Sequence, residues 1–529
     1  MKLIYININK IFFTFFLIFY LTNYNPSFAK ENTSCKFNSD NRIEKIQINI
    51  NKNKQWTKNN IKILISNTKI IPEKFKKRYS GDLNIKYKDG SLCKLKAKIR
   101  QNGDFRDHIF YKDNKIFQSL DIKLLNGNFA NITNFKLLLD GTRGISEDEI
   151  FLTEILRKLN YIAPRTKFIN VEINGTIQKM LFQEKSRKEL LEFHNRTESS
   201  IFEANERDLF KSLEEFKNNN QNIYEIGLVK SSEYNALGTF VKQLNSTWFH
   251  KSNIHAKISY KALSRLNLIY SNSIDYFKND KNDYYFNDQL SNLNLGGLKK
   301  ENIIRLEKYN LILRLFNAEH ALNGHNRKFY WNNTENYFEP IYYDGNPNIF
   351  KFLENKNNFQ INIYTKTAID QLKKDLDDLD NNDFRNIFFD KNVDFLNSKI
   401  KEKIAILKYN LSKIDQEYEI FKKKELKFET PKKFGKKILK NSIKYKMDRN
   451  KNAIFLFKNL NDKNQNKFLI CKEYENCKEI ELSFEKQAKL VEGNLFKNSK
   501  EYIFVGEFNF NEIYNELKNF NQFSTKDKK

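Results

Sequence analysis

The stretch of sequence that decides the fold runs from residue 159 to residue 184 and reads LNYIAPRTKFINVEINGTIQKMLFQE. Two runs within it, Thr166–Ile173 and Ile177–Gln183, are rich in the β-branched and aromatic residues that favour strands. The pair Asn174-Gly175 separates them, and Asn-Gly strongly favours a tight hairpin turn. The stretch therefore predicts a β-hairpin.

Strand patterns also precede this hairpin. Apolar and polar residues alternate in the runs Arg42–Asn51, Asp82–Tyr87 and Cys93–Arg100, as they do in strands with one buried face. Shorter runs at Leu120–Leu125 and Phe135–Leu139 indicate two further strands. Residues 30–205 are thus predicted to form a β-rich region.

Helical patterns appear later in the chain. Residues 146–159 read as a helix in which Ser146 and Glu149 form a capping box. Residues 206–429 are mainly helical in pattern, apart from a hairpin predicted from Arg327–Trp331 and Phe338–Tyr343. Residues 430–529 return to short strands and end in a Lys-rich tail, which indicates a β-rich appendix.

The composition is strongly basic. Among 529 residues, 92 Lys and Arg against 65 Asp and Glu give a net charge of +27. Lys, Asn, Ile and Phe are all frequent, a bias that AT-rich coding produces without any functional cause. With 6 Pro and 16 Gly, collagen-like and Pro-rich linker proteins are excluded. No zinc-finger, helix-turn-helix or RNP pattern is present, so no nucleic-acid partner is expected.

Residues 1–29 have the pattern of a secretory signal peptide. Lys2 and Lys10 flank the apolar run Ile11–Tyr20, and small residues at Ser27 and Ala29 mark a cleavage site. The apolar run is short for a membrane-spanning helix, and no later stretch is apolar enough. We expect an exported protein, periplasmic or extracellular, with no transmembrane segment after signal cleavage.

Export would allow the four cysteines to form disulfides. Cys471 and Cys477 lie in a strand–turn–strand pattern and are expected to pair, which leaves Cys35 and Cys93 as a second pair. Free buried thiols are an alternative. Zinc binding is the least favoured alternative, because neither pair has the usual zinc spacing.

The first group of candidate site residues is RQNGDFRDH, from Arg100 to His108. Gly103 would allow a ligand to approach the backbone, and the Arg100 guanidinium can bind phosphate or carboxylate. The alternative is a polar turn with local ion pairs.

A second group centres on Lys123, which alternates with apolar residues on a predicted strand. Its ammonium would point away from the apolar face, either into water or towards the phosphates of a ligand. Glu149, Glu154 and Glu184 are candidates for a carboxylate that orients it.

The third group is EHALNGHNRKFY, residues 319–330, together with IYYDGN, residues 341–346. Asn326 begins one strand of the predicted hairpin and Asp344 follows the other, so the two side chains are expected to be neighbours. Amide and carboxylate oxygens suit a divalent cation such as Mg²⁺. His320 and His325 lie close by in the sequence. The alternative is that Asn326 and Asp344 are ordinary turn residues.

These parts, in this order, resemble the CotH (spore-coat protein H) kinase-like family over roughly Leu83–Ile349. The resemblance rests on KAKIRQNGD, on residues 159–184, and on NRKFYW followed by IYYDG. It implies an α+β, atypical protein-kinase-like two-lobe fold, with a β-rich N-terminal lobe and a helical C-terminal lobe. The C-terminal β-rich appendix lies outside it.

The resemblance also implies roles for individual residues. Asn326 and Asp344 would hold Mg²⁺ or Mn²⁺, and Lys123 would contact the phosphates of ATP. No Asp precedes Asn326 at the position of a kinase base, which leaves His320, His325 and Glu319 as candidate bases. The implied function is phosphoryl transfer from ATP to a protein hydroxyl, on a protein or envelope-polymer substrate. A catalytically inactive cell-envelope protein that binds glycan or anionic polymer is the alternative.

Overall fold

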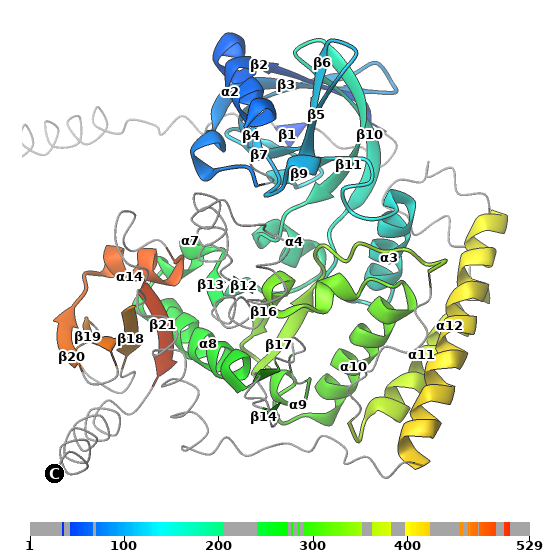
Figure 1. Ribbon diagram of the computed structural model, residues 1–529, viewed down its shortest axis with the longest axis vertical. Helices are drawn as coiled ribbons and strands as arrows, with labels where there is room; N and C mark the ends of the chain where they lie inside the picture. The colour runs from blue at the N-terminus through cyan, green and yellow to red at the C-terminus, as the bar shows by residue number, and fades with distance from the viewer. Residues whose placement is uncertain are drawn as a thin grey trace, which may run out of the picture.

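Figure 1 shows the computed structural model of the chain. The structure describes residues 34–35, 43–66, 70–204, 241–272, 277–278, 284–285, 290, 292–351, 362–381, 397–423, 454–458, 464, 466–473, 476–493 and 502–507. The predicted signal peptide lies outside these ranges. Within them, every helix is too short or too polar to cross a membrane.

The N-terminal region forms a closed barrel of seven strands in the order β10-β11-β9-β7-β4-β3-β2 (Figure 1). Side chains alternate across its wall: in β4, Leu95, Ala97 and Ile99 point into the apolar core. The barrel strands are β2 (Ile43–Ile50), β3 (Tyr79–Tyr87), β4 (Leu92–Gln101), β7 (Leu120–Leu124), β9 (Asn134–Leu139), β10 (Thr166–Ile173) and β11 (Thr176–Glu184).

The closed barrel contradicts the expected kinase-like two-lobe fold, in which the β-rich lobe is an open sheet. β2 closes the barrel because it pairs with β3 on one side and, in parallel, with β10 on the other. Gln47 and Glu172, which are 125 residues apart in the chain, are hydrogen-bonded across the β2–β10 pair at 3.2 Å. Alternation of apolar residues predicts each strand but carries no information on which strands pair.

The predicted Asn-Gly hairpin is confirmed as β10 and β11, which pair up to Ile173 and Thr176 on either side of the turn. Asn174 and Gly175 both have positive φ angles, 46° and 89°. A type I′ turn requires this conformation at both central residues, and Asn and Gly adopt it at low cost.

Small elements surround the barrel. α2 (Asn53–Ile65) packs Trp56 into the barrel core, where its ring meets Tyr79 edge-on with centroids 5.2 Å apart. The others are β1 (Ser34–Cys35), η1 (Glu73–Phe75), η2 (Arg106–His108), β5 (Ile109–Lys112), β6 (Lys115–Gln118) and β8 (Asn128–Phe129).

The predicted helix is confirmed as α3 (Ser146–Lys158), but the predicted capping box is wrong. Ile145 is the N-cap residue and no side chain caps the helix. The Ile145 amide instead donates to the Pro347 carbonyl at 3.0 Å, so a contact with a distant segment replaces the local cap. Glu149 is consequently free to point into the protein.

The second half combines a four-stranded sheet, order β13-β12-β16-β17, with helices on its flanks. α10, α11 and α12 share one apolar core with α3, whereas α8 packs against β16 and β17. The elements are α4 (Lys188–Phe193), β12 (Ile201–Ala204), β13 (Val241–Gln243), α7 (Ser246–Phe249), α8 (Asn253–Asn272), β14 (Phe277–Lys278), β15 (Tyr284–Tyr285), α9 (Asn292–Leu295), α10 (Lys300–Leu315), η3 (Glu319–Leu322), η4 (Gly324–Asn326), β16 (Lys328–Asn332), β17 (Tyr337–Ile341), α11 (Thr365–Asn381) and α12 (Asn397–Lys423).

The C-terminal region forms a second four-stranded sheet, order β20-β19-β18-β21, with one helix. Cys471 and Cys477 face each other across β19 and β20 and are joined by the predicted disulfide. Cys93 is also disulfide-bonded. The sheet shares an apolar core with α8, so it is not a detached appendix. Its elements are β18 (Ile454–Lys458), β19 (Lys467–Glu473), β20 (Asn476–Glu481), α14 (Phe484–Val491) and β21 (Tyr502–Glu507).

We predict that Ile122→Ala lowers the free energy of unfolding by ~2–5 kcal/mol, because Ile122 is fully buried in the barrel core. The matched control is Lys123→Ala, on the same strand but exposed, which should change it by less than ~0.5 kcal/mol. Urea denaturation measures both. Equal decreases in the free energy of unfolding for the two variants would contradict the assignment of Ile122 to the inner face of β7 and Lys123 to its outer face.

Candidate functional site

The chain leaves β17 through a segment with unusual backbone geometry. Asp344 and Asn346 both have φ angles in the left-handed region, 52° and 55°. Asp and Asn adopt this conformation more readily than other non-glycine residues, and here it turns the chain sharply after β17. Between them, a Cβ on Gly345 would lie 2.5 Å from the Tyr342 hydroxyl oxygen, so only glycine fits there without rearrangement.

Three cations surround the ring of Tyr343, which directly precedes Asp344. The Lys328 and Lys136 nitrogens lie 3.7 Å and 4.8 Å from the ring centroid, and the Arg143 guanidinium carbon lies 4.9 Å from it. Lys136 and Arg143 also donate hydrogen bonds to the Tyr343 hydroxyl oxygen, at 3.0 Å and 3.2 Å. We call these five residues, with Asp344 included, the Tyr343 cluster.

The three cations of the Tyr343 cluster lie on different elements of the fold. Lys136 points outward from the barrel because its neighbours in β9, Phe135 and Leu137, are buried in the barrel core. Lys328 is the first residue of β16 and is also paired with Glu203 at 3.0 Å. The barrel wall and the β16–β17 hairpin therefore meet at one tyrosine.

Arg143 reaches the Tyr343 cluster through a close backbone contact. A Cβ on Gly144 would lie 2.6 Å from the Asn346 carbonyl carbon and from the Pro347 oxygen, and Gly144 has a φ of 68°. Only glycine can let two backbones approach this closely. The Arg143 guanidinium is thereby held against the Asp344 carboxylate in an ion pair.

The cations and the carboxylate of the Tyr343 cluster alter one another's protonation. Burial would raise the pKa of Asp344, but the Arg143 guanidinium outweighs it and holds that pKa below its ordinary value. Burial lowers the pKa of Lys136 to about 8, and the nearby Arg143 charge adds to this. Among the described residues, no carboxylate lies within ion-pair distance of Lys136.

A second buried carboxylate lies on the barrel wall beside the cluster. Asp121 faces Lys136 across the β7–β9 pair, but its oxygens bind Lys185 at 2.7 Å, Arg78 at 3.1 Å and Arg100 at 3.3 Å. Burial would raise the pKa of Asp121, and these three cations instead hold it far below its ordinary value. The Asp121 carboxylate therefore forms its ion pairs with these three cations and not with Lys136.

Glu149 lies behind the cluster on α3 and is completely buried. Its carboxylate accepts hydrogen bonds from the Tyr342 hydroxyl at 2.5 Å and from the Gln183 amide at 2.8 Å. Burial raises the pKa of Glu149 to about 7, although these hydrogen bonds and Arg143 act in the opposite direction. Glu149 is therefore a titratable link between α3 and the residue next to Tyr343.

The predicted metal residues lie in the same neighbourhood but are not joined to each other. Asn326 donates its side-chain amide to the His320 backbone carbonyl at 3.2 Å, whereas Asp344 binds Arg143. No contact between described residues joins Asn326 to Asp344. The exposed His320 lies near enough to Asp344 for its charge to help lower the pKa of that carboxyl. The side chain of His325 is not among those described.

No cluster of three or more His, Cys, Asp or Glu side chains suited to a metal ion occurs in the described part of the chain. A divalent ion at Asp344 would therefore not be held by a cluster of such side chains from the described residues. Mg²⁺ commonly binds in this way, through one or two carboxylates plus the phosphates of a substrate.

The other predicted site residues have structural surroundings. Lys123 is exposed on the outer barrel wall, opposite Lys98 and Asn134 in neighbouring strands. Glu154 forms an ion pair with Arg157 within α3. Glu184 is bound by the Arg165 guanidinium through two hydrogen bonds of 2.7 Å.

In the predicted Arg100–His108 loop, Arg100 belongs to the Asp121 pair described above. Gly103 has a φ of 103°, and a Cβ there would lie 2.1 Å from the His108 ring. A protein side chain therefore occupies the space that the sequence suggested for a ligand. His108 is buried, and burial lowers its pKa to about 4.

Sequence reasoning missed the cations that the structure brings together: Lys136, Arg143 and Lys328. Lys136 carries the same signal as Lys123, an outward position in an alternating strand, and its strand directly precedes α3 in the sequence. The pair Arg143-Gly144 carries a weaker signal, a glycine beside a cation.

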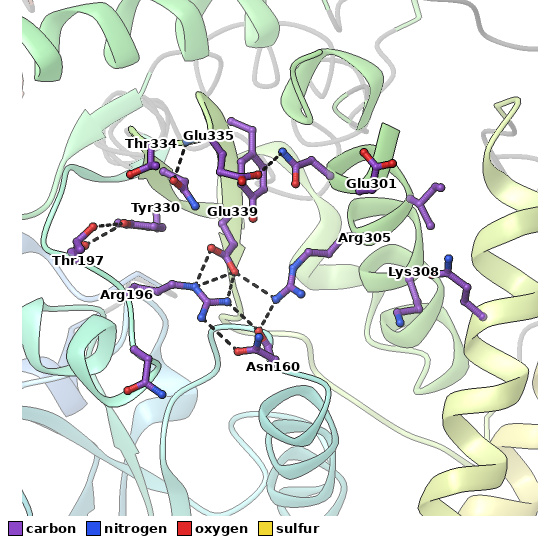
Figure 2. A pocket seen from close by; sticks show the side chains of 16 residues that line it. Asn160, Arg196, Thr197, Glu301, Arg305, Lys308, Tyr330, Thr334, Glu335 and Glu339 are labelled. Carbon is purple, nitrogen blue, oxygen red and sulfur yellow. Dashed lines mark hydrogen bonds and ion pairs between the residues drawn. The ribbon is translucent and has the colours of Figure 1, made fainter. Parts of the chain in front are cut away.

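A polar pocket of about 640 Å³ is lined by residues of β16, β17 and α10 and by Asn160 after α3 (Figure 2). Figure 2 shows Arg196 and Arg305 both pointing at Glu339, with nearest contacts of 2.6 Å and 3.2 Å. Both guanidinium groups also donate to the Asn160 carbonyl after α3. These contacts connect β17, α10 and the end of α3, so we assign the two arginines a structural role.

No family model matches this chain, and no curated protein matches it either. The function must therefore be argued from the residues of the chain itself.

We predict that Glu149→Gln reduces the pH dependence of stability. The folded-state pKa of about 7 lies above the ordinary 4.5, so the folded protein binds more protons between these pH values. Stability should therefore fall as pH rises from about 4.5 to 7, by up to ~3 kcal/mol from this group. Glu149→Gln should remove that part of the slope in urea titrations across this pH range.

The matched control is Glu147→Gln, an exposed acid in the same helical turn. It should leave the slope unchanged. If both variants keep the slope of the wild type, Glu149 does not have the raised pKa described here.

Proposed function

We propose that the Tyr343 cluster binds the phosphates of a nucleotide such as ATP and transfers a phosphoryl group to a hydroxyl of a protein or envelope-polymer substrate. The observation that carries the proposal is that Lys136, from the barrel, binds Tyr343, the residue directly before Asp344. Lys136 and Tyr343 are hydrogen-bonded although 207 residues separate them in the chain. An ammonium from one region and a carboxylate from another are the two charges that phosphoryl transfer requires.

The cationic side of the cluster supports binding of phosphate. Lys136 has no carboxylate partner among the described residues, and the buried Arg143 Nε has no hydrogen-bond partner there. Burial of an ammonium whose hydrogen bond goes to a neutral phenol oxygen is costly, and a phosphate oxygen would relieve that cost. At pH 7 a lysine with a pKa of about 8 is still mostly protonated, so Lys136 keeps the charge that a phosphate needs.

The carboxylate side supports a divalent cation that arrives with the nucleotide. Asp344 remains ionised at neutral pH and is about 17% exposed, so it can exchange Arg143 for a metal ion. Asp344, with Asn326 nearby, would hold Mg²⁺ or Mn²⁺, which would neutralise charge between the phosphate oxygens. Arg143, once released, would be free to bind phosphate.

In the proposed reaction, the hydroxyl oxygen of the substrate forms a bond to the γ-phosphorus of ATP. The bond from that phosphorus to the oxygen bridging to the β-phosphate breaks, and ADP leaves. The proton of the hydroxyl passes to a base, and the exposed imidazole of His320 beside Asp344 is the described group that fits this role. Lys136 and Arg143 stabilise the charge on the phosphates.

The CotH resemblance points to the same class of reaction. The alternative, an inactive protein that binds glycan or anionic polymer at the cell envelope, has one observation in its favour. Asp344 is already neutralised by Arg143, and that arrangement would persist if no metal ever displaced the guanidinium.

We predict that ATP with MgCl₂ or MnCl₂ stabilises the protein against thermal unfolding, by ~2.7 kcal/mol at a hundredfold excess over the dissociation constant. Lys136→Met should weaken nucleotide binding about tenfold to hundredfold, the effect of losing a charge-assisted hydrogen bond. Lys123→Met, on the same face of the adjacent barrel strand β7, is the matched control and should bind like the wild type.

Asp344→Asn should abolish the part of the stabilisation that depends on metal, and it should abolish phosphoryl transfer to an added substrate. Asp82→Asn, which changes an exposed carboxylate on the barrel, should do neither. Melting curves that do not move with any nucleotide and metal would count against the proposal. Stabilisation without transfer would favour the inactive alternative.

A further inference from the structure

We infer that a basic groove between α2 and the barrel binds a linear chain of phosphate groups. The groove has a volume of about 610 Å³, and its walls contain six cations and no carboxylate. This second site is independent of the proposed function of the Tyr343 cluster. Its lining residues are Asn51, Lys52, Gln55, Lys58, Asn59, Lys62, Lys77, Arg78, Tyr79, Ser80 and Lys98.

One wall of the groove is a single face of α2. Lys52, Gln55, Lys58 and Lys62 recur at helical spacing, while Trp56 and Ile63, on the adjoining side of the helix, are buried. From Lys52 to Lys62 the helix rises ~15 Å, so the charged wall is long enough for an extended ligand rather than one ion. Like charges four residues apart, as at Lys58 and Lys62, destabilise a helix by ~0.2–0.5 kcal/mol unless an anion lies between them.

The other wall comes from the barrel. Lys77 and Arg78 directly precede β3, and Lys98 lies in β4 with its ammonium hydrogen-bonded to the Ser80 hydroxyl at 2.8 Å. Among the described residues, no carboxylate lies within ion-pair distance of Lys52, Lys58, Lys62, Lys77 or Lys98. Five ammonium groups therefore converge on the groove without a counter-charge from the protein.

The chemistry of the walls favours phosphate chains over other polyanions. Lysine ammonium groups are compact charges with three donors each, which suit phosphate oxygens without requiring a fixed orientation. The one aromatic residue that lines the groove, Tyr79, packs against Trp56. Nucleic-acid bases would have no aromatic surface on which to stack, and an acidic peptide would have no apolar pocket for its side chains.

Arg78 connects the groove to the candidate site. Its guanidinium lines the groove and also binds Asp121 at 3.1 Å, and Asp121 lies opposite Lys136 in the barrel wall. Asp121 therefore lies between a residue that lines the groove and a residue of the Tyr343 cluster.

The test measures binding of a short-chain inorganic polyphosphate to the full-length protein by fluorescence anisotropy at several salt concentrations. The triple variant Lys58→Gln, Lys62→Gln, Lys77→Gln removes three ammonium groups from both walls. Each lost phosphate contact should reduce the slope of log K against log salt by ~0.7, so the slope should become shallower by ~2. Affinity at low salt should fall at least tenfold.

The matched control removes three exposed lysines from α3 and α8 instead: Lys158→Gln, Lys257→Gln and Lys261→Gln. It has the same net charge as the groove variant and should retain the slope of the wild type. Equal losses in the two triple variants would overturn the proposal, because they would indicate binding by general charge. Binding of poly-glutamate or single-stranded DNA as tight as that of polyphosphate would also overturn it.

Two further variants separate this site from the proposed function. Asp344→Asn should leave polyphosphate binding unchanged, and the groove triple variant should keep the stabilisation by ATP and metal. Loss of polyphosphate binding in Asp344→Asn would place the polymer at the Tyr343 cluster and overturn the groove assignment. Circular dichroism melts of the triple variant check that α2 remains folded.

Discussion

The contact between the backbone of Gly144 and the segment Asn346–Pro347 is the constraint on which the candidate site depends. It brings the loop after β9 within van der Waals distance of the loop after β17 and supplies a hydrogen bond to the start of α3. Arg143 and Asp344 can pair only because these two loops meet. A side chain at position 144 would separate the loops, and the barrel would no longer share a site with the hairpin.

The charges around this contact are not balanced locally, and this imbalance is the strongest physical argument for a ligand. Asp121 forms ion pairs with three cations, and Asp344 forms one ion pair, with Arg143. The ammonium of Lys136 instead donates a hydrogen bond to the phenol oxygen of Tyr343. Burial lowers the pKa values of Lys136 and Lys185 to about 8, so keeping both charged costs folding energy. An anion at the cluster would recover part of that energy. The pocket in Figure 2 differs, because both of its arginines form ion pairs with a carboxylate, that of Glu339.

The sequence predicted several individual elements correctly, but it did not predict how the elements assemble. The Asn-Gly hairpin, the helix after Ser146 and the disulfide between Cys471 and Cys477 all follow from local patterns, and all three are present. The kinase-like two-lobe fold was wrong because the β2–β10 pairing that closes the barrel leaves no local trace. Lys123 was singled out as the phosphate lysine although Lys136 has the same alternation, because alternation tells which residues point outward but not what they face.

The sequence by itself determined which segments become strands and helices, because periodicity and turn residues act over a few neighbouring positions. It also determined that Asp344 follows a hairpin strand, and that the chain carries an excess of cations. Only the tertiary structure decided which of those cations gather at Tyr343 and which line the groove beside α2. That choice rests on the closure of the barrel and on a glycine contact between residues two hundred positions apart. Contacts of this kind depend on how whole elements pack, and no local pattern records them.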